Sequence, residues 1–440
     1  MDLNERLSNV SVLGAGGKMG SGISLLIAQE VALQKLMPQN QSIDYQLNLI
    51  DINADALSGL KSYIQSQAGK FASKNIEMLR DYFPDSDDDL ILSSFSDKLL
   101  SVLNFSTDIR TAAKSLLVFE AVIEKIDLKV SIFKELKSEC SSETFFLSNT
   151  SSIPIKLMDE EAGLQGRIIG YHFYNPPAVQ RLVEVIIPEE LHPGLKEISY
   201  QLGERLRKIL IPSNDVAGFI GNGHFTRDGL HALSEVKSLQ SEITLVQAIY
   251  LMNKISQDFL LRPMGIFQLI DYVGIDVFQS ILNIMNPYFD NENLESQLIN
   301  RMVDTDVVGG QFPDGSQKNG FLKYEDHKPI GVYDPDLNQY VLFSELYEKV
   351  DNMIGEIPEG HSPWKFLLKD PDRDNKLRIY FENLKTADTL GASLALQYLK
   401  RSKEIGEKLL TDGVANKIED VNGVLTNGFF HLYGPINEYV

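Results

Sequence analysis

The chain has 440 residues, of which 43% are hydrophobic and 23% are charged, and it carries a formal net charge of −20 at pH 7. Its length predicts two or three domains, and its composition is typical of a globular protein that can build a sizeable core. The excess of acidic groups argues against non-specific binding to nucleic acid or to an anionic membrane surface, so a phosphate-bearing ligand would need local hydrogen-bond donors.

The single cysteine, Cys140, excludes a disulfide framework and indicates a reducing compartment, for which the cytoplasm is the default. The first residues contain no basic run followed by an apolar core of signal length, and no apolar stretch is long enough to span a bilayer. We therefore expect neither a membrane nor a nucleic acid partner, and no pattern of metal ligands stands out.

The first strong pattern is a short apolar strand, residues 9–13, that runs into a glycine-rich turn and then into a helix with apolar residues at helical spacing. This order is typical of a dinucleotide-binding βαβ unit, in which glycines let the backbone approach a pyrophosphate and the helix N-terminus supplies N–H groups. The spacing is G-x-x-G-x-x-G through Gly14, Gly17 and Gly20, as though one residue were inserted into the usual motif. An ordinary glycine turn is the alternative.

The second predicted strand, residues 45–52, carries Asp51 near its end. An acidic residue there accepts hydrogen bonds from the adenosine ribose diol and repels a 2′-phosphate, which favours NAD over NADP. The gap between the glycines and this acid is longer than usual because residues 34–45 look like an inserted polar loop. The alternative is that Asp51 is only a turn residue.

Two further strand ends carry polar residues. Residues 115–124 form a nearly continuous apolar run that ends in Glu124, and the helix that follows carries Lys129. Another buried strand ends in the hydroxyl cluster around Ser151. In open parallel sheets, ligands sit at the carboxyl ends of the strands, so we expect these groups to lie near the glycine turn.

A predicted hairpin follows, with strands at residues 167–173 and 181–187 and a loop that contains Asn175. Alternation places Glu184 on an apolar face of its strand, where an ionised carboxylate needs a partner. His172 is the candidate, because a carboxylate behind an imidazole orients the ring and stabilises its protonated form. The alternative is that His172 ends a strand and Glu184 pairs with a surface lysine.

Five segments, in this order, resemble the L-3-hydroxyacyl-CoA dehydrogenases over roughly residues 9–325. They are VFEAVIEKIDLKVSIFKEL, FLSNTSSIPI, GYHFYNPPAVQRLVEVI, DVAGFIGN and RPMGIFQLIDYVGID. The resemblance implies an α/β Rossmann-type N-terminal domain, an all-α C-terminal part, NAD as cofactor and an acyl-CoA thioester as substrate. The implied reaction is reversible oxidation of an L-3-hydroxyacyl-CoA to the 3-ketoacyl-CoA, in fatty-acid β-oxidation or short-chain acyl-CoA metabolism.

The resemblance also implies roles for single residues. The family's general base matches His172, and its partner carboxylate matches Glu184. The hydroxyl that contacts the 3-oxygen of the substrate matches Ser151, and the asparagine that orients the substrate matches Asn222. The implied cofactor contacts are Gly14, Gly17, Met19, Gly20, Asp51, Glu124, Lys129 and Asn175. Gly223 departs from the arginine that usually follows the asparagine. The alternatives are a dehydrogenase of a small free hydroxy acid or sugar acid, and a non-catalytic protein that binds NAD or CoA.

The chain divides by pattern into four parts: an NAD-binding domain at 1–212, a helical substrate domain at 213–325, a linker or small hairpin subdomain at 326–375, and a second, degenerate helical domain at 376–440. The second helical domain is predicted from a short sequence pattern that occurs twice, as Gly265…Asp271-Tyr272-Val273 and as Gly434…Glu438-Tyr439-Val440. Single-domain relatives usually dimerise through the helical domain. The internal copy, which resembles the arrangement of multifunctional fatty-acid oxidation proteins, therefore predicts a pseudo-dimeric monomer, with a homodimer as the alternative.

Overall fold

The computed structural model describes residues 1–84, 86–312 and 315–440, and the chain forms two compact units, Met1–Asp215 and Val216–Val440. The first unit contains an eight-stranded sheet in the order β3-β2-β1-β4-β5-β6-β7-β8. Its strands are β1 (Asn9–Leu13), β2 (Gln46–Ile50), β3 (Leu103–Ser106), β4 (Leu117–Glu120), β5 (Phe145–Ser148), β6 (Ile168–Phe173), β7 (Leu182–Ile187) and β8 (Ile209–Asn214).

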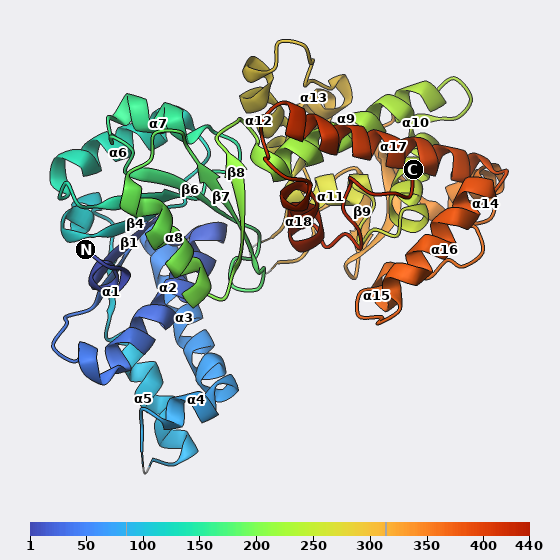
Figure 1. The fold of residues 1–440 in the computed structure, drawn as a ribbon. Helices are drawn as coiled ribbons and strands as arrows, with labels where there is room; N and C mark the ends of the chain where they lie inside the picture. The colour runs from blue at the N-terminus through green and yellow to red at the C-terminus, as the bar shows by residue number, and fades with distance from the viewer. Residues whose placement is uncertain (85, 313–314) are drawn as a thin grey trace. The chain divides into compact units, whose positions relative to one another are not determined.

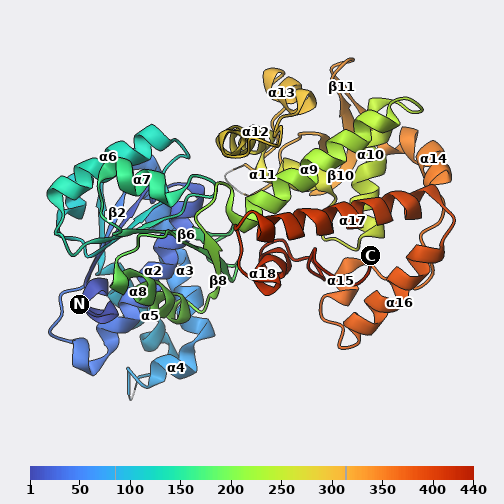
Figure 2. The same ribbon diagram turned by 45° about the horizontal axis from the view of Figure 1, so that its top comes forward.

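Strands β1 to β6 are parallel to their neighbours, whereas β7 runs antiparallel to β6 and β8 runs parallel to β7. Figures 1 and 2 show α6 and α7 on one face of the sheet and α2, α3 and α8 on the other. Central strands covered on both faces are buried along their whole length and mostly apolar, as β4 and β5 are, where only the last residues, Glu120 and Ser148, are polar. The predicted α/β Rossmann-type fold is confirmed.

The helices of this unit follow the predicted pattern closely. They are α1 (Leu3–Leu7), α2 (Lys18–Leu36), η1 (Pro38–Asn40), α3 (Ala54–Lys74), α4 (Ile76–Arg80), α5 (Asp88–Leu100), η2 (Ile109–Lys114), α6 (Ile126–Glu139), α7 (Ile155–Ala162) and α8 (Pro193–Arg205). The loop expected at residues 34–45 begins later than predicted, because buried Gln34 continues α2. Its side-chain amide donates to Glu30 and its backbone carbonyl accepts from Asn40.

The second unit is mostly helical. Its elements are α9 (Phe219–Leu239), α10 (Leu245–Lys254), a π-helical turn η3 (Ile255–Phe259), α11 (Ile266–Val273), α12 (Ile275–Met285), η4 (Asn286–Tyr288), α13 (Gln297–Asp304), β9 (Leu322–Glu325), β10 (Lys328–Asp334), β11 (Gln339–Leu342), α14 (Phe343–Ile354), α15 (Trp364–Leu367), α16 (Arg373–Thr386), α17 (Leu390–Thr411) and α18 (Ile418–Gly428). The expected hairpin belongs to a three-stranded antiparallel sheet, β11-β10-β9.

Helices α9 and α17 pack side by side, and one hydrophobic core takes residues from both halves of the unit (Figure 2). A buried polar network crosses this contact. The Arg262 guanidinium pairs with Asp228 Oδ2 at 2.7 Å, and the Tyr398 hydroxyl donates to the same oxygen at 3.0 Å. An ion pair this deep in the core is stabilising only while both partners and their hydrogen bonds are present.

The same contact between an asparagine and a glycine occurs twice in the second unit, at the same spacing along the chain. Asn253 of α10 accepts backbone N–H groups with its side-chain oxygen just after Gly265. Asn422 of α18 does the same with the N–H of Ile436, just after Gly434. In both cases a Cβ on the glycine would collide with the asparagine side chain.

Within the described residues, no helix has both the length and the apolar character required to cross a bilayer. In that same part of the chain, no group of His, Cys, Asp and Glu side chains is arranged to hold a metal ion.

Candidate functional site

The register of β6 and β7 places His172 directly opposite Glu184. His172 Nδ1 lies 3.5 Å from Glu184 Oε2, and the Glu184 carboxylate is fully buried. A carboxylate in this position favours the tautomer with the proton on Nδ1, which leaves Nε2 as the proton acceptor. The pair is therefore arranged as a base with an orienting carboxylate.

Tyr174 is a third member of this cluster that sequence reasoning missed. Its hydroxyl donates to Glu184 Oε2 at 3.0 Å, and its ring centroid lies 4.7 Å from that of His172. Burial and the neighbouring carboxylate raise the pKa of Tyr174 well above its usual value, so the hydroxyl stays protonated and remains a donor. The available signal was its position two residues after His172 in an extended segment, which puts both side chains on one side of the chain.

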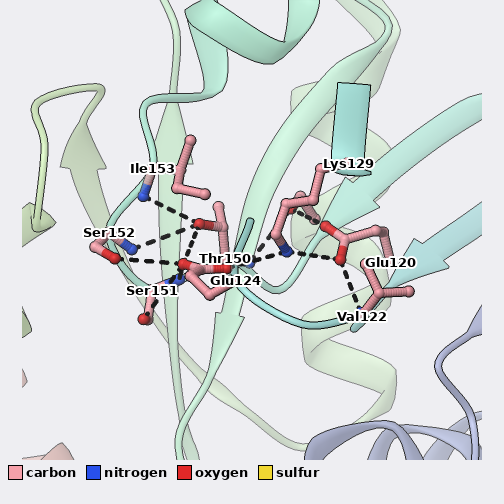
Figure 3. A network of polar contacts seen from close by, with 9 residues as sticks. Glu120, Val122, Glu124, Lys129, Thr150, Ser151, Ser152 and Ile153 are labelled. Atoms are coloured by element: carbon pink, nitrogen blue, oxygen red, sulfur yellow. Dashed lines mark hydrogen bonds and ion pairs between the residues drawn. The ribbon is translucent and has the colours of Figure 1, made fainter. Parts of the chain in front are cut away.

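A second cluster joins the ends of β4 and β5 (Figure 3). Glu124 Oε1 accepts from the Thr150 hydroxyl at 2.6 Å, the Ser151 backbone N–H at 2.9 Å and the Ser152 hydroxyl at 3.3 Å. Its other oxygen pairs with Lys129 Nζ at 3.0 Å. Burial would raise the pKa of Glu124, but the Lys129 charge and these donors outweigh burial and hold it below its usual value.

The strand expected at residues 115–124 ends earlier than predicted, at Glu120 of β4, which leaves Glu124 in the loop before α6. The chain turns there because the Glu120 carboxylate accepts the Val122 N–H at 2.8 Å and pairs with Lys129 at 2.7 Å. Sequence reasoning missed Glu120 because it lies inside an apolar run and looks like part of a strand.

The glycine turn brings backbone segments unusually close together. Gly14 has a φ of +71°, and a Cβ there would lie 2.6 Å from the Ala121 carbonyl oxygen. A Cβ on Gly20, in the first turn of α2, would collide with the Gly14 carbonyl. A turn this tight leaves the backbone exposed to a bound pyrophosphate at the start of a helix, so the residues present fit a dinucleotide.

Gly16 is a further member of the turn, beyond the predicted Gly14, Gly17 and Gly20. Its N–H donates to Asp51 Oδ2 at 2.9 Å, and a Cβ there would lie 2.6 Å from Ala56 Cβ. Gly17 is the N-cap residue of α2. The Asp51 carboxylate, immediately after β2, therefore holds the glycine turn through this hydrogen bond.

The remaining predicted residues occupy separate places. Met19 lies half-buried in the first turn of α2, and Asn175 lies in the loop between β6 and β7. Lys208 supports that loop, because its ammonium donates to the carbonyl oxygens of Pro177 and Gln180, each at 2.6 Å. Asn222 lies in the first turn of α9, in the second unit.

Packing against α17 explains why residue 223 is a glycine. A Cβ at this position would lie 3.0 Å from Leu409 Cδ2 of α17, and the Gly223 carbonyl accepts from Arg227 Nη1 at 2.8 Å. A side chain at residue 223 would therefore press on the end of the Leu409 side chain.

Residues 9–216 match the family model described as "3-hydroxyacyl-CoA dehydrogenase, NAD binding domain", and residues 252–323 match "3-hydroxyacyl-CoA dehydrogenase, C-terminal domain". A protein of Mus musculus named "Hydroxyacyl-coenzyme A dehydrogenase, mitochondrial" is 30% identical over 326 residues, which cover 72% of this chain and 92% of the relative. A "Probable 3-hydroxybutyryl-CoA dehydrogenase" of Deinococcus radiodurans is 27% identical over 309 residues, covering 70% of this chain and 98% of the relative.

Among solved structures, the 3-hydroxybutyryl-CoA dehydrogenase of Escherichia coli K12 is similar with a TM-score of 0.65 and 21% sequence identity. The match covers 98% of this chain and 90% of the other chain. At this identity the likeness shows the fold.

Proposed function

Because the chain belongs to the 3-hydroxyacyl-CoA dehydrogenase family, whose cofactor is NAD, we propose that it oxidises an L-3-hydroxyacyl-CoA reversibly to the 3-ketoacyl-CoA. The observation that carries this proposal is the buried Glu184 carboxylate opposite His172. The proposed setting is fatty-acid β-oxidation or short-chain acyl-CoA metabolism, in the cytoplasm.

We assign the proton transfer to His172. With Nδ1 directed at Glu184, Nε2 takes the proton of the substrate alcohol, and Glu184 stabilises the imidazolium that forms. The Ser151 hydroxyl and Asn222 are assigned to the reacting oxygen and the thioester end, where they would orient the substrate C–H bond. Bound NAD supplies the hydride acceptor.

We assign cofactor binding to the first unit. Gly14, Gly17, Met19 and Gly20 would hold the pyrophosphate at the start of α2, and Asp51 the adenosine ribose. Glu124 and Asn175 would lie toward the nicotinamide end. Asp51 would repel a 2′-phosphate, in keeping with NAD rather than NADP.

The test is the substitution His172→Gln, assayed with acetoacetyl-CoA and NADH by the fall in absorbance. We expect kcat/KM to drop by roughly 10²–10⁴-fold, because the general base is lost. His192→Gln is the matched control. That histidine caps α8 by accepting the Gly194 N–H, so its loss should leave turnover unchanged.

Two outcomes would contradict the proposal: a wild-type protein that reduces no short or medium-chain ketoacyl-CoA, or a His172→Gln variant as active as wild type. Free 3-hydroxybutyrate, assayed in the oxidative direction beside its CoA thioester, separates the proposed substrate class from a small free hydroxy acid. Turnover of the free acid as fast as the thioester would replace the acyl-CoA assignment.

We further propose that residues 376–440 are a degenerate second copy of the helical domain, which makes the chain a pseudo-dimeric monomer. The repeated asparagine–glycine contact supports this, because Asn422 and Gly434 reproduce the arrangement of Asn253 and Gly265. The close approach of α17 to α9 at Gly223 also supports it, since α17 then covers the surface that a second chain would use.

A further inference from the structure

Glu120 is the most enclosed carboxylate of the Figure 3 cluster, and the mechanism above does not use it. Its side chain is 0% exposed. Oε1 accepts the Val122 N–H and the Lys129 ammonium, and Oε2 accepts the Ser148 hydroxyl. A group with its oxygens occupied in this way and no exposed surface cannot touch substrate or cofactor, so any effect on the reaction must pass through a neighbour.

Lys129 is that neighbour. Its ammonium lies 2.7 Å from Glu120 Oε1 and 3.0 Å from Glu124 Oε2, and only 1% of its side chain is exposed. Burial would lower the pKa of Lys129, but the two carboxylates outweigh burial and raise it, so the side chain stays charged. The lysine therefore joins the end of β4 to the loop before α6.

Glu124 connects Lys129 to residues 150–152 through hydrogen bonds. With Oε2 held by Lys129, Oε1 is directed at the Thr150 hydroxyl and the Ser151 N–H. The position of the Ser151 backbone thus depends on where Lys129 holds Glu124. Ser151 is the residue assigned to the substrate 3-oxygen, so this inference rests on the proposed function.

We propose that Glu120 is a positioning residue for the reaction, acting through Lys129 and Glu124 on the segment that carries Ser151. Lys129 serves the site in the same indirect way, as a buried link between two carboxylates. Without the Glu120 charge, Lys129 has a single ionic partner and moves toward Glu124, which turns Oε1 away from the Ser151 N–H. A displacement on the order of 1 Å at a reacting group is enough to lower the rate about 100-fold.

The first test is Glu120→Gln, which keeps the shape of the side chain and removes its charge. We expect kcat with acetoacetyl-CoA to fall roughly 10–100-fold. The Kd for NADH should change by a smaller factor, because the glycine turn is untouched and Glu124 is the only group assigned to the cofactor that moves. Glu30→Gln is the matched control. Glu30 is a buried carboxylate of the same unit that pairs with Arg205 at 3.5 Å, outside this network, and kcat should stay at the wild-type value.

The second test is a double-mutant cycle with Lys129→Met. If Glu120 acts through the lysine, Glu120→Gln should cost nothing further in kcat once Lys129 is absent, and the double variant should be at least as active as Lys129→Met alone. Effects of the two substitutions that multiply would overturn the proposal. Lys129→Met leaves Glu120 buried without a cationic partner. If this variant does not fold for that reason, the exchange measurement below decides.

Hydrogen exchange at the Ser151 amide gives a readout that does not need turnover. Glu120→Gln should speed exchange of this amide by about tenfold or more relative to wild type, and Glu30→Gln should not. If the wild-type enzyme is active but Glu120→Gln changes neither kcat nor exchange, this inference is wrong and the proposed function stands. If wild type reduces no ketoacyl-CoA, the function fails, and exchange still decides whether Glu120 positions Ser151.

Discussion

Tyr174 and His172 share one oxygen of Glu184, and this sharing sets how strongly the carboxylate supports the imidazole. The tyrosine hydroxyl donates at 3.0 Å, closer than the 3.5 Å that separates His172 Nδ1 from the same atom. A hydrogen bond to a carboxylate disperses its charge and weakens its attraction for a neighbouring cation. Tyr174 thus limits the stabilisation of the His172 imidazolium.

The substitution Tyr174→Phe should therefore strengthen the contact between Glu184 and the imidazolium. We expect kcat/KM in the oxidative direction, with an L-3-hydroxyacyl-CoA and NAD at one fixed pH, to rise by about two- to fivefold. The sign follows because the imidazolium that forms when His172 takes the alcohol proton is then better stabilised. Steady-state rates of the variant and wild type measure this change.

Tyr171→Phe is the control for that experiment. The Tyr171 side chain is also buried, but its hydroxyl donates to the Ser199 carbonyl at 3.0 Å. Its loss should leave kcat/KM at the wild-type value. An equal change in both variants would point to a general loosening of β6, and no change in either would rule out the effect of Tyr174 on Glu184.

Prediction at the residue scale succeeded where one strong local rule applied. Strand alternation and the cost of an isolated buried carboxylate were enough to suggest that His172 and Glu184 meet. Tyr174 and Glu120 were missed because a tyrosine in a loop and a glutamate in an apolar run have ordinary alternative roles. Their partners become visible only when strands distant in sequence lie side by side.

At the scale of elements, the contact between α9 and α17 contains buried groups that respond to acid. Burial lowers the pKa of His224 and Asp228 raises it, and together with the Arg262 and Arg227 charges, which lower it, the result is about 4. Burial would raise the pKa of Asp228, but Arg262 and His224 outweigh burial and hold it at about 2. His431 is half-buried, and desolvation and the Arg262 charge hold its pKa well below the usual value.

We expect His224 to lower the stability of the second unit as the pH falls from about 6.5 to about 4, against the opposite contribution of Asp271, whose pKa burial raises to about 8. In that window the unfolded chain binds a proton at His224 with its ordinary pKa of about 6.5, and the folded chain does not. The stabilisation is complete above pH 6.5 and is lost as the pH falls through the folded value of about 4. Asp228 adds a second loss only below about pH 4.

The measurement is the midpoint of urea unfolding at several pH values, followed for wild type, His224→Gln and His327→Gln. Compared with wild type, His224→Gln should lose less stability between pH 6.5 and 4, whatever its effect at pH 7. His327 lies exposed in a turn, so its substitution should leave the slope unchanged. A slope that is the same in all three proteins would contradict this account.

Element boundaries were predicted less well than element types. The apolar run at residues 115–124 predicted a strand through Glu124, but β4 ends at Glu120 because that carboxylate pairs with Lys129 and accepts the Val122 N–H. The predicted polar loop at residues 34–45 starts late because Gln34 is buried. Both errors come from single polar side chains whose partners lie elsewhere in the fold.

At the scale of the whole molecule, the proposed second helical copy predicts that the protein is a monomer. Light scattering at micromolar concentration should give a mass near that of one chain, 49.4 kDa. The physical reason is that α17 already covers α9. A dimer mass, with the surface of α9 at the interface between chains, would contradict the proposal.

The proposed internal repeat could be read only in part from the sequence. The two copies of the short pattern, at Gly265 and Gly434, were recognisable because they share a glycine, an acid and Tyr-Val. The asparagines that define the contact, Asn253 and Asn422, lie in the preceding helices, where an asparagine has no distinctive pattern. The likeness of the two asparagine–glycine contacts is therefore visible only in the structure.

The attachment of α17 to α9 through one backbone has a consequence for behaviour on dilution. When two chains must meet to cover an apolar face, the folded population falls as the protomer concentration falls. Two segments of one chain instead meet at an effective concentration that is set by their connection and does not change on dilution. The helical unit should therefore keep its fold, and its melting temperature, even at nanomolar protein.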